Sequence, residues 1–438
     1  MFTFKSYKIN REAATVHFTY ELVHDDEQFS FVEKISFDPA RADFTRAPEA
    51  VLTAAFDTLF LILGISYWKL FCSKEIKLET IKLSPEQAKF WNTVYTKGLG
   101  EFFYKNNIDF RGLVNFPVSD VQKQKVEVLP KVGKSLVLWG GGKDSIVTTE
   151  LLKSCGKEFD LFSLNEYEIQ KKVAGIAGKS LLIVRREIDP QLFELNQRTD
   201  VYNGHVPISC IYSTTAVLAA LLYGYDSVLI SNEESANYGN MEYLGEYINH
   251  QWSKSHEFEK MLQQYLANFV TPSIIYFSFI RAFHEIKIVE FFSKYPHYFE
   301  SFSSCNKNFK IEKTEHGLWC GECPKCAFVF ALLSAFVPKA EVLKIFGKNL
   351  FAEKSLQKTY RELLGLEEIK PFDCVGTPEE TQLAFYLARQ KGGYEGDVIM
   401  HEFVAHFEKV FPEIKMSRET LLEKNATSLL PADFNHCL

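Results

Sequence analysis

The sequence has no excess of basic residues: 49 lysines and arginines stand against 56 aspartates and glutamates, a formal net charge of −7. Nucleic acids and anionic membranes attract positive charge, so a chain this acidic is a poor generic binder of either. We therefore expect no nucleic-acid partner and no membrane partner. Repeats, heptads and low-complexity segments are also missing. A hydrophobic fraction of 46% and a charged fraction of 24% are typical of an ordinary globular protein.

The sequence also lacks a hydrophobic run long enough to predict a membrane span. Its most apolar stretch, residues 51–72, contains Asp57 and Lys69, and the clean part covers only residues 58–68. A membrane span needs about 20 apolar residues. We expect a buried helix instead.

The chain opens on strand-like alternation rather than on a secretory signal, which predicts a cytoplasmic protein. In a reducing compartment its nine cysteines are expected to be thiols or metal ligands rather than disulfides. Five cysteines are isolated in the sequence, and we expect them only to pack: Cys72, Cys155, Cys210, Cys374 and Cys437.

At 438 residues the chain is long enough for two or three domains. Residues 1–130 combine alternating strand patterns with helical patterns, which predicts an α+β N-terminal domain. Over residues 131–300 short apolar runs alternate with helical patterns, which is typical of βαβ units and predicts an α/β domain with a doubly wound parallel sheet. We expect mostly helix after about residue 256, a four-cysteine insert at 301–330 and a helical C-terminal region at 331–438.

A glycine-rich loop joins a predicted strand to a predicted helix at residues 140–145. Its three glycines, Gly140, Gly141 and Gly142, allow a tight turn that points N–H groups at one place. Lys143 adds a positive charge, and the helix that follows adds its positive N-terminal end. A glycine run alone would fit a simple turn equally well, but the whole pattern predicts a phosphate site. It is not a Walker A loop, because its glycines are contiguous and Asp144 follows the lysine.

With Ser145 as a hydroxyl donor, this loop resembles the Ser-Gly-Gly-x-Asp-Ser signature of the PP-loop ATP pyrophosphatases, which have a HUP-like fold. The resemblance implies that ATP is cleaved between its α and β phosphates and that a substrate oxygen is adenylated, with Mg²⁺ present. It also implies that residues 140–145 hold the pyrophosphate and that Asn165, at the end of the next strand, holds the adenosine. Gly140 stands where the family has serine, so main-chain donors must replace one hydroxyl.

Three cysteines lie within seven residues, and a fourth lies 15 residues upstream: Cys320, Cys323, Cys326 and Cys305. The C-x2-C spacing lets one loop wrap a metal, and four thiolates suit tetrahedral zinc. We predict a structural zinc site. Three alternatives stay open: His316 could replace Cys305 as the fourth ligand, the cysteines could be catalytic thiols, or they could be buried without a ligand.

Several polar segments contain candidates for acid–base chemistry and for substrate binding. Residues 231–234 follow a predicted strand, as the glycine loop does, so both should face the crevice at the carboxyl ends of a parallel sheet. Carboxylates there could hold magnesium or act as a base. Each of the other segments, 203–207, 249–255 and 281–285, is by itself more often a turn, a cap or a solvated face.

Taken together, the glycine loop, these segments and the cysteine run resemble the family of ATP-dependent epimerases that act on a UDP-muramoyl dipeptide in peptidoglycan precursor synthesis. The resemblance covers most of the chain. It implies epimerisation of the terminal L-Glu of UDP-MurNAc-L-Ala-L-Glu to D-Glu through an acyl-adenylate, with release of AMP and pyrophosphate. The candidate proton carriers are His205, Glu233, Glu234, His250 and His284. The candidate substrate-binding residues are Asn232, Lys254 and Arg281.

Two other PP-loop activities stay open on the sequence. A ligase resembling 7-cyano-7-deazaguanine synthase shares the glycine loop and a four-cysteine site, but it has a tighter cysteine spacing and lacks the N-terminal domain. A tRNA-thiolating enzyme would need a basic auxiliary domain, and this chain is acidic throughout.

Overall fold

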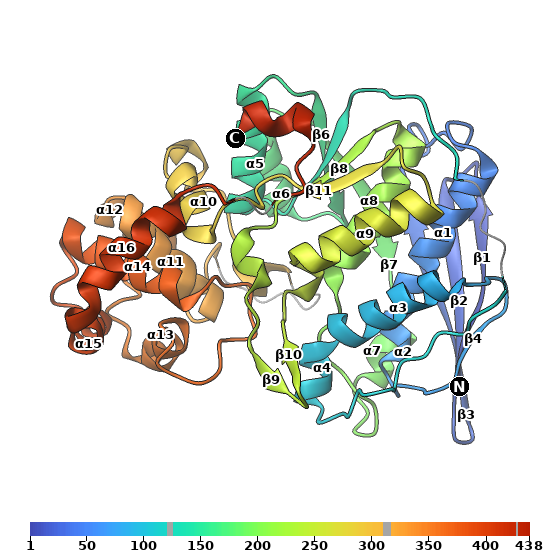
Figure 1. Cartoon of the computed structure of the whole chain (residues 1–438), viewed down its shortest axis with the longest axis horizontal. Coiled ribbons are helices and arrows are strands. Elements are labelled where there is room, and N and C mark those ends of the chain that lie inside the picture. Colours follow the sequence, from blue (N-terminus) through green and yellow to red (C-terminus); the bar gives the residue numbers. More distant parts are fainter. Residues whose placement is uncertain (121–125, 310–316, 426–427) are drawn as a thin grey trace.

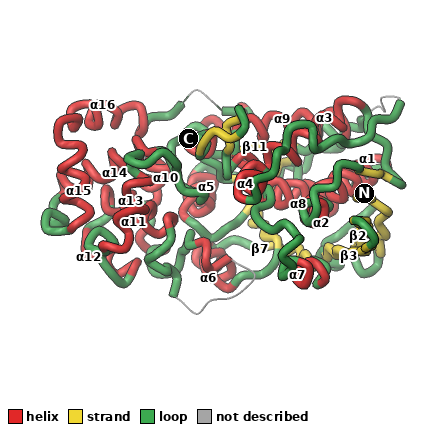
Figure 2. The backbone as a smooth tube through the Cα atoms, turned by 90° about the horizontal axis from the view of Figure 1, so that it is seen from below, coloured by secondary structure: helices red, strands yellow, loops and turns green. Residues whose placement is uncertain are grey.

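The structure is a computed structural model that describes residues 1–120, 126–309, 317–425 and 428–438. The helical C-terminal region lies at one end of an elongated molecule and the N-terminal strands lie at the other (Figures 1 and 2). The strands are β1 (Phe2–Asn10), β2 (Thr15–His24), β3 (Glu27–Ser36), β4 (Ile76–Leu78), β5 (Ser135–Leu138), β6 (Phe159–Leu164), β7 (Leu181–Glu187), β8 (Ser227–Ile230), β9 (Met241–Tyr243), β10 (Glu246–Ile248) and β11 (Ile275–Ser278).

The α-helices alternate with the strands up to β11. After β11 the regular elements in the described residues are α-helices and short 3₁₀ helices. The α-helices are α1 (Glu49–Leu63), α2 (Ile65–Trp68), α3 (Pro85–Gly98), α4 (Gly100–Lys105), α5 (Lys143–Ser154), α6 (Glu168–Ala177), α7 (Gln191–Leu195), α8 (Ile208–Tyr223), α9 (His256–Phe269), α10 (Glu285–Phe292), α11 (Pro324–Phe336), α12 (Lys339–Phe346), α13 (Gln357–Leu363), α14 (Pro378–Lys391), α15 (Val398–Phe407) and α16 (Phe411–Leu422).

One mixed sheet runs through the molecule, and its strand order in the described residues is β11-β8-β5-β6-β7-β3-β2-β1-β4. The five strands from β11 to β7 pair in parallel. Strand β3 then pairs antiparallel with β7, at Lys34–Ser36 against Arg185–Glu187. The predicted α/β class with a parallel-rich sheet is confirmed. The N-terminal strands extend this same sheet, and the predicted boundary at residue 130 stays a prediction.

The parallel part of the sheet reverses its strand order between β5 and β8. The chain passes from β5 outward to β6 and β7, and then returns to β8 on the other side of β5. Both faces are covered: Leu136 and Leu138 pack into a core shared with α1, α8 and α9, whereas Val137 packs into a core shared with α10 and α11. Ligands of such sheets bind beyond the carboxyl ends of the strands, where the order reverses.

In the described part of the chain, one helical segment, Glu49–Trp68, is long and apolar enough to cross a membrane by length and composition. Most of it is buried inside the protein, and α1 lies against α8. This agrees with the buried helix predicted from the sequence. Its apolar residues belong to the larger of the two cores.

The expectation that Cys155 and Cys437 only pack is wrong, because the two form a disulfide across 282 positions of sequence. The chain leaves the helical region after α16 and returns to the sheet, where its last turn lies beside α5 (Figure 1). Two lone cysteines at such a separation carry no local pattern, and only the path of the folded chain brings them together. Strand β11 is a second departure, since the sequence predicted mostly helix in that region.

Candidate active site

Two loops follow neighbouring parallel strands at the point where the strand order reverses. The glycine loop follows β5, and residues 231–234 follow β8, so the prediction that they share one edge of the sheet is confirmed. The start of α10 joins them, where Glu285 donates its backbone N–H to Ser235 Oγ at 3.0 Å. The charges of Asp144 and Lys143 act on Glu233 across this edge.

The glycine loop presents the N-terminus of α5 with no side-chain cap from the described residues. Gly141 has a φ of +71°, and a Cβ there would lie 3.3 Å from the Gln170 Cα. A Cβ on Gly142 would lie 2.8 Å from the Ser304 hydroxyl, whereas a Cβ on Gly140 would meet nothing within 4 Å. The positive φ therefore requires glycine at position 141, whereas at position 142 a larger residue would only displace the Ser304 hydroxyl. The free helix end can receive an anion.

Lys143, the lysine of the loop, is fully buried in ion pairs. Its Nζ lies 2.6 Å from Glu285 Oε1 and also contacts Asp144. Lys325, between two cysteines of the C-x2-C run, places its Nζ 2.8 Å from the same Glu285 oxygen. Burial would raise the pKa of Glu285, but the charges of Lys143 and Lys325 outweigh it and lower the pKa to about 2. Glu285 is thus a permanent carboxylate that links the loop to the cysteine run.

Glu233 is a buried carboxyl group with an unusual proton affinity. Burial and then the negative charges of Glu285 and Asp144 raise its pKa to about 7. A group that gains and loses a proton near neutral pH is suited to general acid–base catalysis. Its backbone carbonyl accepts a hydrogen bond from Arg281, which fixes the position of the loop.

Several buried polar atoms at this edge have no hydrogen-bond partner among the described residues: Ser231 Oγ, Asn232 Nδ2, Glu234 Oε2, His284 Nδ1 and Glu285 Oε2. Buried polar atoms are normally paired, so a cluster of unpaired ones indicates a place where a ligand supplies the partners. The predicted residues Asn232, Glu234 and His284 are therefore brought together with the glycine loop, and their roles stay predictions.

Arg281 is fully buried and bound to other parts of the protein. Its Nε lies 2.9 Å from Glu259 Oε2, and its two terminal nitrogens donate to the backbone carbonyls of Glu233 and Lys254. These contacts make Arg281 a positioning residue for the loop that contains Glu233 and for the turn that contains Lys254. Its predicted contact with a substrate carboxylate stays a prediction.

Asn165, predicted at the adenosine, ends β6 in the left-handed region with a φ of +67°. Its Oδ1 accepts the backbone N–H of Arg186 on β7 at 2.7 Å, and its own N–H donates to the Val184 carbonyl. The side-chain oxygen is thus bound within the sheet. A contact with adenosine stays a prediction.

A second cluster of ionisable groups lies around Cys374, in the segment between α13 and α14. Lys254 Nζ lies 3.2 Å from Cys374 Sγ, and His250 is also hydrogen-bonded to this sulfur. Nδ1 of His250 contacts Glu101 of α4. The His205 ring lies tilted beside the His250 ring, with the ring centroids 4.5 Å apart. The predicted residues His205, His250 and Lys254 therefore come together around two residues that the sequence did not single out.

The charges of this cluster set its protonation. Burial would raise the pKa of Cys374, but Lys254 and His250 lower it to about 6. Burial would lower the pKa of His250, but its bonds to Cys374 and Glu101 raise it to about 9. Burial and the charge of His250 lower the pKa of His205 to about 3. The expectation that Cys374 only packs is wrong, because its sulfur contacts the Lys254 ammonium and is hydrogen-bonded to His250.

The four cysteines of the predicted insert gather at one place. Cys305, Cys320, Cys323 and Cys326 each offer a sulfur, and the four atoms lie within 4.8 Å of one another. Such a group could hold a metal ion. His316, the alternative fourth ligand, lies outside the described residues.

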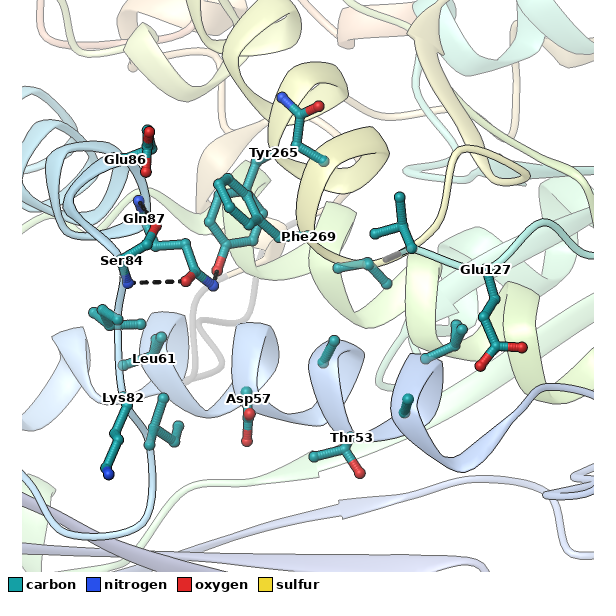
Figure 3. A pocket seen from close by; sticks show the side chains of 18 of the residues that line it. Thr53, Asp57, Leu61, Lys82, Ser84, Glu86, Gln87, Glu127, Tyr265 and Phe269 are labelled. Atoms are coloured by element: carbon teal, nitrogen blue, oxygen red, sulfur yellow. Dashed lines mark hydrogen bonds between the residues drawn. The ribbon is translucent and has the colours of Figure 1, made fainter. Parts of the chain in front are cut away.

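One pocket in the described part of the chain lies away from both clusters. It has a volume of about 620 Å³ and opens between α1, α3 and α9 (Figure 3). It is lined by Asp57, Gln87 and Tyr265 among others, and Gln87 Nε2 donates to the Tyr265 hydroxyl at 3.5 Å. It contains no residue of the glycine loop or of the Cys374 cluster, so we leave it out of the site.

The comparison with protein families covers almost the whole chain. The family model described as MurL N-terminal domain matches residues 1–279, and the one described as MurL C-terminal domain matches residues 301–418. The chain belongs to the MurL family. The glycine loop, residues 231–234 and the Cys374 cluster lie within the matched MurL ranges, whereas Arg281, His284 and Glu285 lie between them.

Three curated MurL relatives cover most of the chain, and each is named UDP-N-acetyl-alpha-D-muramoyl-L-alanyl-L-glutamate epimerase. The Xanthomonas oryzae protein is 36% identical over 86% of this chain and 84% of its own length. The Micromonospora protein is 35% identical over 92% and 90%, and the Salinispora tropica protein is 35% identical over 90% and 86%. These relatives favour the epimerase over the two other activities that the sequence left open.

Proposed function

We propose that this chain epimerises the terminal L-glutamate of UDP-N-acetylmuramoyl-L-alanyl-L-glutamate to D-glutamate. The observation that carries the proposal is the match to three relatives with that name over at least 84% of their length. Their identities of 35–36% to this chain support a shared reaction. The substrate is a small molecule, and the proposal includes no nucleic acid and no membrane.

The reaction needs help because the α-proton of a carboxylate is very weakly acidic: its removal would place a second negative charge beside the first. We propose that ATP supplies an adenylyl group to the α-carboxylate of the glutamate, which gives an acyl-adenylate and pyrophosphate. The α-proton of this neutral acyl group can leave as the electron pair moves into the carbonyl. Reprotonation on the opposite face inverts the carbon, and water then releases AMP.

The glycine loop fits the phosphates of ATP in a PP-loop arrangement. The uncapped start of α5 and the glycine required at position 141 leave main-chain donors directed at one place. Lys143 adds a charge, although Asp144 and Glu285 share it. Ser145 Oγ donates to the Gly142 carbonyl at 3.0 Å, so it shapes the loop from within.

Magnesium would need carboxylate oxygens that are not consumed by protein partners. Glu234 Oε2 and Glu285 Oε2 are buried at the same edge of the sheet and have no partner among the described residues. Hard oxygen ligands of this kind are what Mg²⁺ prefers. We assign Glu234 to it, because Glu285 already binds two lysines and Asp144 contacts Lys143.

Glu233 is the proton-transfer residue that the geometry favours among the five candidates. It is buried beside the glycine loop, and its pKa near 7 allows it to act as an acid or as a base at neutral pH. His250 and His205 belong to the second cluster, where Glu101 holds them.

Structural zinc on the four cysteines would fix the start of α11 and with it Lys325. A cytoplasmic location is part of the same proposal.

Incubation with ATP, Mg²⁺ and the UDP-muramoyl dipeptide in deuterated water tests the proposal. We expect AMP, pyrophosphate, deuterium at the glutamate α-carbon and D-glutamate after hydrolysis. AMP without α-deuterium would leave adenylation standing and refute epimerisation. The Lys143→Met variant should lose pyrophosphate release, and retained release would contradict the phosphate role of the loop.

A further inference from the structure

We propose that Cys374 is a catalytic residue: its sulfur exchanges a proton with the substrate α-carbon on one face, while Glu233 serves the other face. This inference rests on the proposed epimerisation. It is carried by the position of Cys374, because the sulfur contacts Lys254 at 3.2 Å and His250, and Lys254 belongs to the backbone segment that is fixed together with Glu233.

Arg281 connects the two proton carriers physically. Its guanidinium donates to the carbonyl of Glu233 and to the carbonyl of Lys254. One buried side chain therefore holds the loop after β8 and the turn that presents Lys254 to Cys374. The charge of Lys254 acts on both Glu233 and Cys374, so both proton carriers lie near the same ammonium group.

The arrangement around Cys374 resembles an activated thiol rather than a packing cysteine. The His250 ring is bonded to both Glu101 and Cys374, and a histidine paired with a carboxylate in this way can orient and stabilise a thiolate. Lys254 and His250 touch the sulfur, and Lys325 adds a more distant positive charge. Cys374 is half-buried.

A structural role would not need this set of charges. Burial raises the pKa of the buried free thiols Cys72 and Cys210, for Cys72 to about 12 even though the charge of Lys69 acts against it. At Cys374 the pKa moves the other way, to about 6. Charged groups in direct contact with the sulfur, rather than burial alone, therefore distinguish Cys374 from the packing cysteines.

The proton balance of the step is simple. The Cys374 thiolate takes the α-proton, an S–H bond forms, and the C–H electron pair moves into the activated carbonyl. Glu233, protonated at the start, gives its proton to the opposite face of the carbon. The turnover leaves a thiol and a carboxylate, and exchange with solvent restores both. In the reverse direction the two groups exchange roles.

Alkylation of the unmodified enzyme by iodoacetamide, mapped by peptide mass spectrometry over pH 5–10, tests the state of the thiol. We expect Cys374 to react with a midpoint near pH 6, whereas Cys72 and Cys210 stay unreactive. In Lys254→Met the midpoint should rise by at least about one unit, which corresponds to about 1.4 kcal/mol. A midpoint near that of an ordinary cysteine in the unmodified enzyme would overturn the proposal.

Deuterium exchange then separates the two faces. Cys374→Ala and Glu233→Gln are each given ATP, Mg²⁺ and the L-Glu or the D-Glu dipeptide in deuterated water. We expect both variants to release pyrophosphate and to lose about 10²–10⁴-fold in epimerisation. Each should still exchange the α-proton of one epimer with retention, and the two variants should differ in which epimer that is. Cys72→Ala is the matched control and should epimerise at the unmodified rate.

These experiments distinguish a failure of the proposed epimerisation from a failure of the proposed role of Cys374. If the unmodified enzyme incorporates no α-deuterium, the proposed function itself fails. If the unmodified enzyme epimerises and Cys374→Ala does too at an equal rate, the role of Cys374 is refuted. Loss of exchange for both epimers in Cys374→Ala with intact pyrophosphate release, or a stable covalent acyl adduct on Cys374, would also refute a role as a single-face proton carrier.

Discussion

The Nζ atom of Lys143 lies 2.6 Å from Oε1 of Glu285, and both side chains are fully buried. Lys325 reaches the same oxygen from the start of α11. The glycine loop after β5 and the cysteine run before α11 are thus fixed to each other through one carboxylate. A charge this deep is tolerated only because it is paired, and removal of the partner leaves uncompensated charge.

The Glu285→Gln substitution tests this link. It leaves two buried lysines facing a neutral amide, so we expect unfolding to become easier by about 3–5 kcal/mol. Glu290→Gln on the same helix is the matched control. Its pair with Lys287, which is only partly buried, should contribute about 0–1 kcal/mol. Urea denaturation of both variants at pH 7 measures the difference, and equal losses would contradict a special role for Glu285.

The Glu285 carboxylate also predicts that the folded protein becomes less stable at low pH. The pKa of Glu285 is lowered to about 2 in the folded chain, below its unfolded value near 4.3. A group of this kind stabilises the fold above its unfolded pKa, and the contribution is lost as pH falls through the folded pKa. We expect the unmodified protein to lose stability between about pH 4.5 and pH 2, and the loss should be smaller in Glu285→Gln. Denaturation curves at a series of pH values check this.

Glu233 predicts the opposite pH dependence. Burial raises its pKa to about 7, so the folded state holds this proton more tightly than the unfolded state and becomes less stable as pH rises from about 4.5 to 7. The Glu233→Gln variant should therefore be more stable than the unmodified protein at pH 8, by about 1–3 kcal/mol, although it loses epimerisation. At pH 4.5, where both carry a neutral side chain, the two proteins should be equally stable. Greater stability at both pH values would show that packing rather than charge is responsible.

The parts of the site that the sequence predicted are those with a local signal. The glycine loop and residues 231–234 each follow a short apolar strand, and that placement alone brings them to one edge of a parallel sheet. The cysteine run was found by its spacing. His250 and Lys254 were found because their segment is densely polar. In each case the chemistry is contained within about ten residues of sequence.

The parts that were missed depend on contacts between distant segments. Glu101 and His250 are 149 positions apart, and Lys254 and Cys374 are 120 apart. The pairing of β3 with β7, which makes the sheet continuous, joins residues 153 positions apart. Strand β11 has only four residues, too few for a periodic pattern. No spacing rule reaches across such separations without the folded chain.

Metal content is the measurement that decides the cysteine cluster. With four sulfurs within 4.8 Å of one another, we expect about one tightly bound zinc per chain. The Cys323→Ser variant should lose the metal and become less stable, because structural zinc contributes directly to the folding free energy. Cys210→Ala is the control and should keep the metal. If the fully reduced, unmodified protein contains no zinc, and Cys323→Ser is as stable as the unmodified protein, the four cysteines are free thiols.

The disulfide between Cys155 and Cys437 predicts a redox-dependent stability. It closes a loop of more than 280 positions, and reduction should lower the free energy of unfolding by about 2–5 kcal/mol. The chain end should stay docked after reduction, because Phe434 packs against Phe277 at 5.0 Å and against Phe279 at 6.3 Å between ring centroids.

Thiol titration of the unfolded oxidised protein should find seven thiols out of nine cysteines, and all nine after reduction. Cys155→Ser is the control, since reductant should not change its stability. If nine thiols titrate before reduction even after mild oxidation, the pair does not form a bond in solution. In a reducing cytoplasm we expect all nine cysteines to be thiols, as they are after treatment with reductant. The Cys155–Cys437 bond would then form only when the protein meets an oxidant.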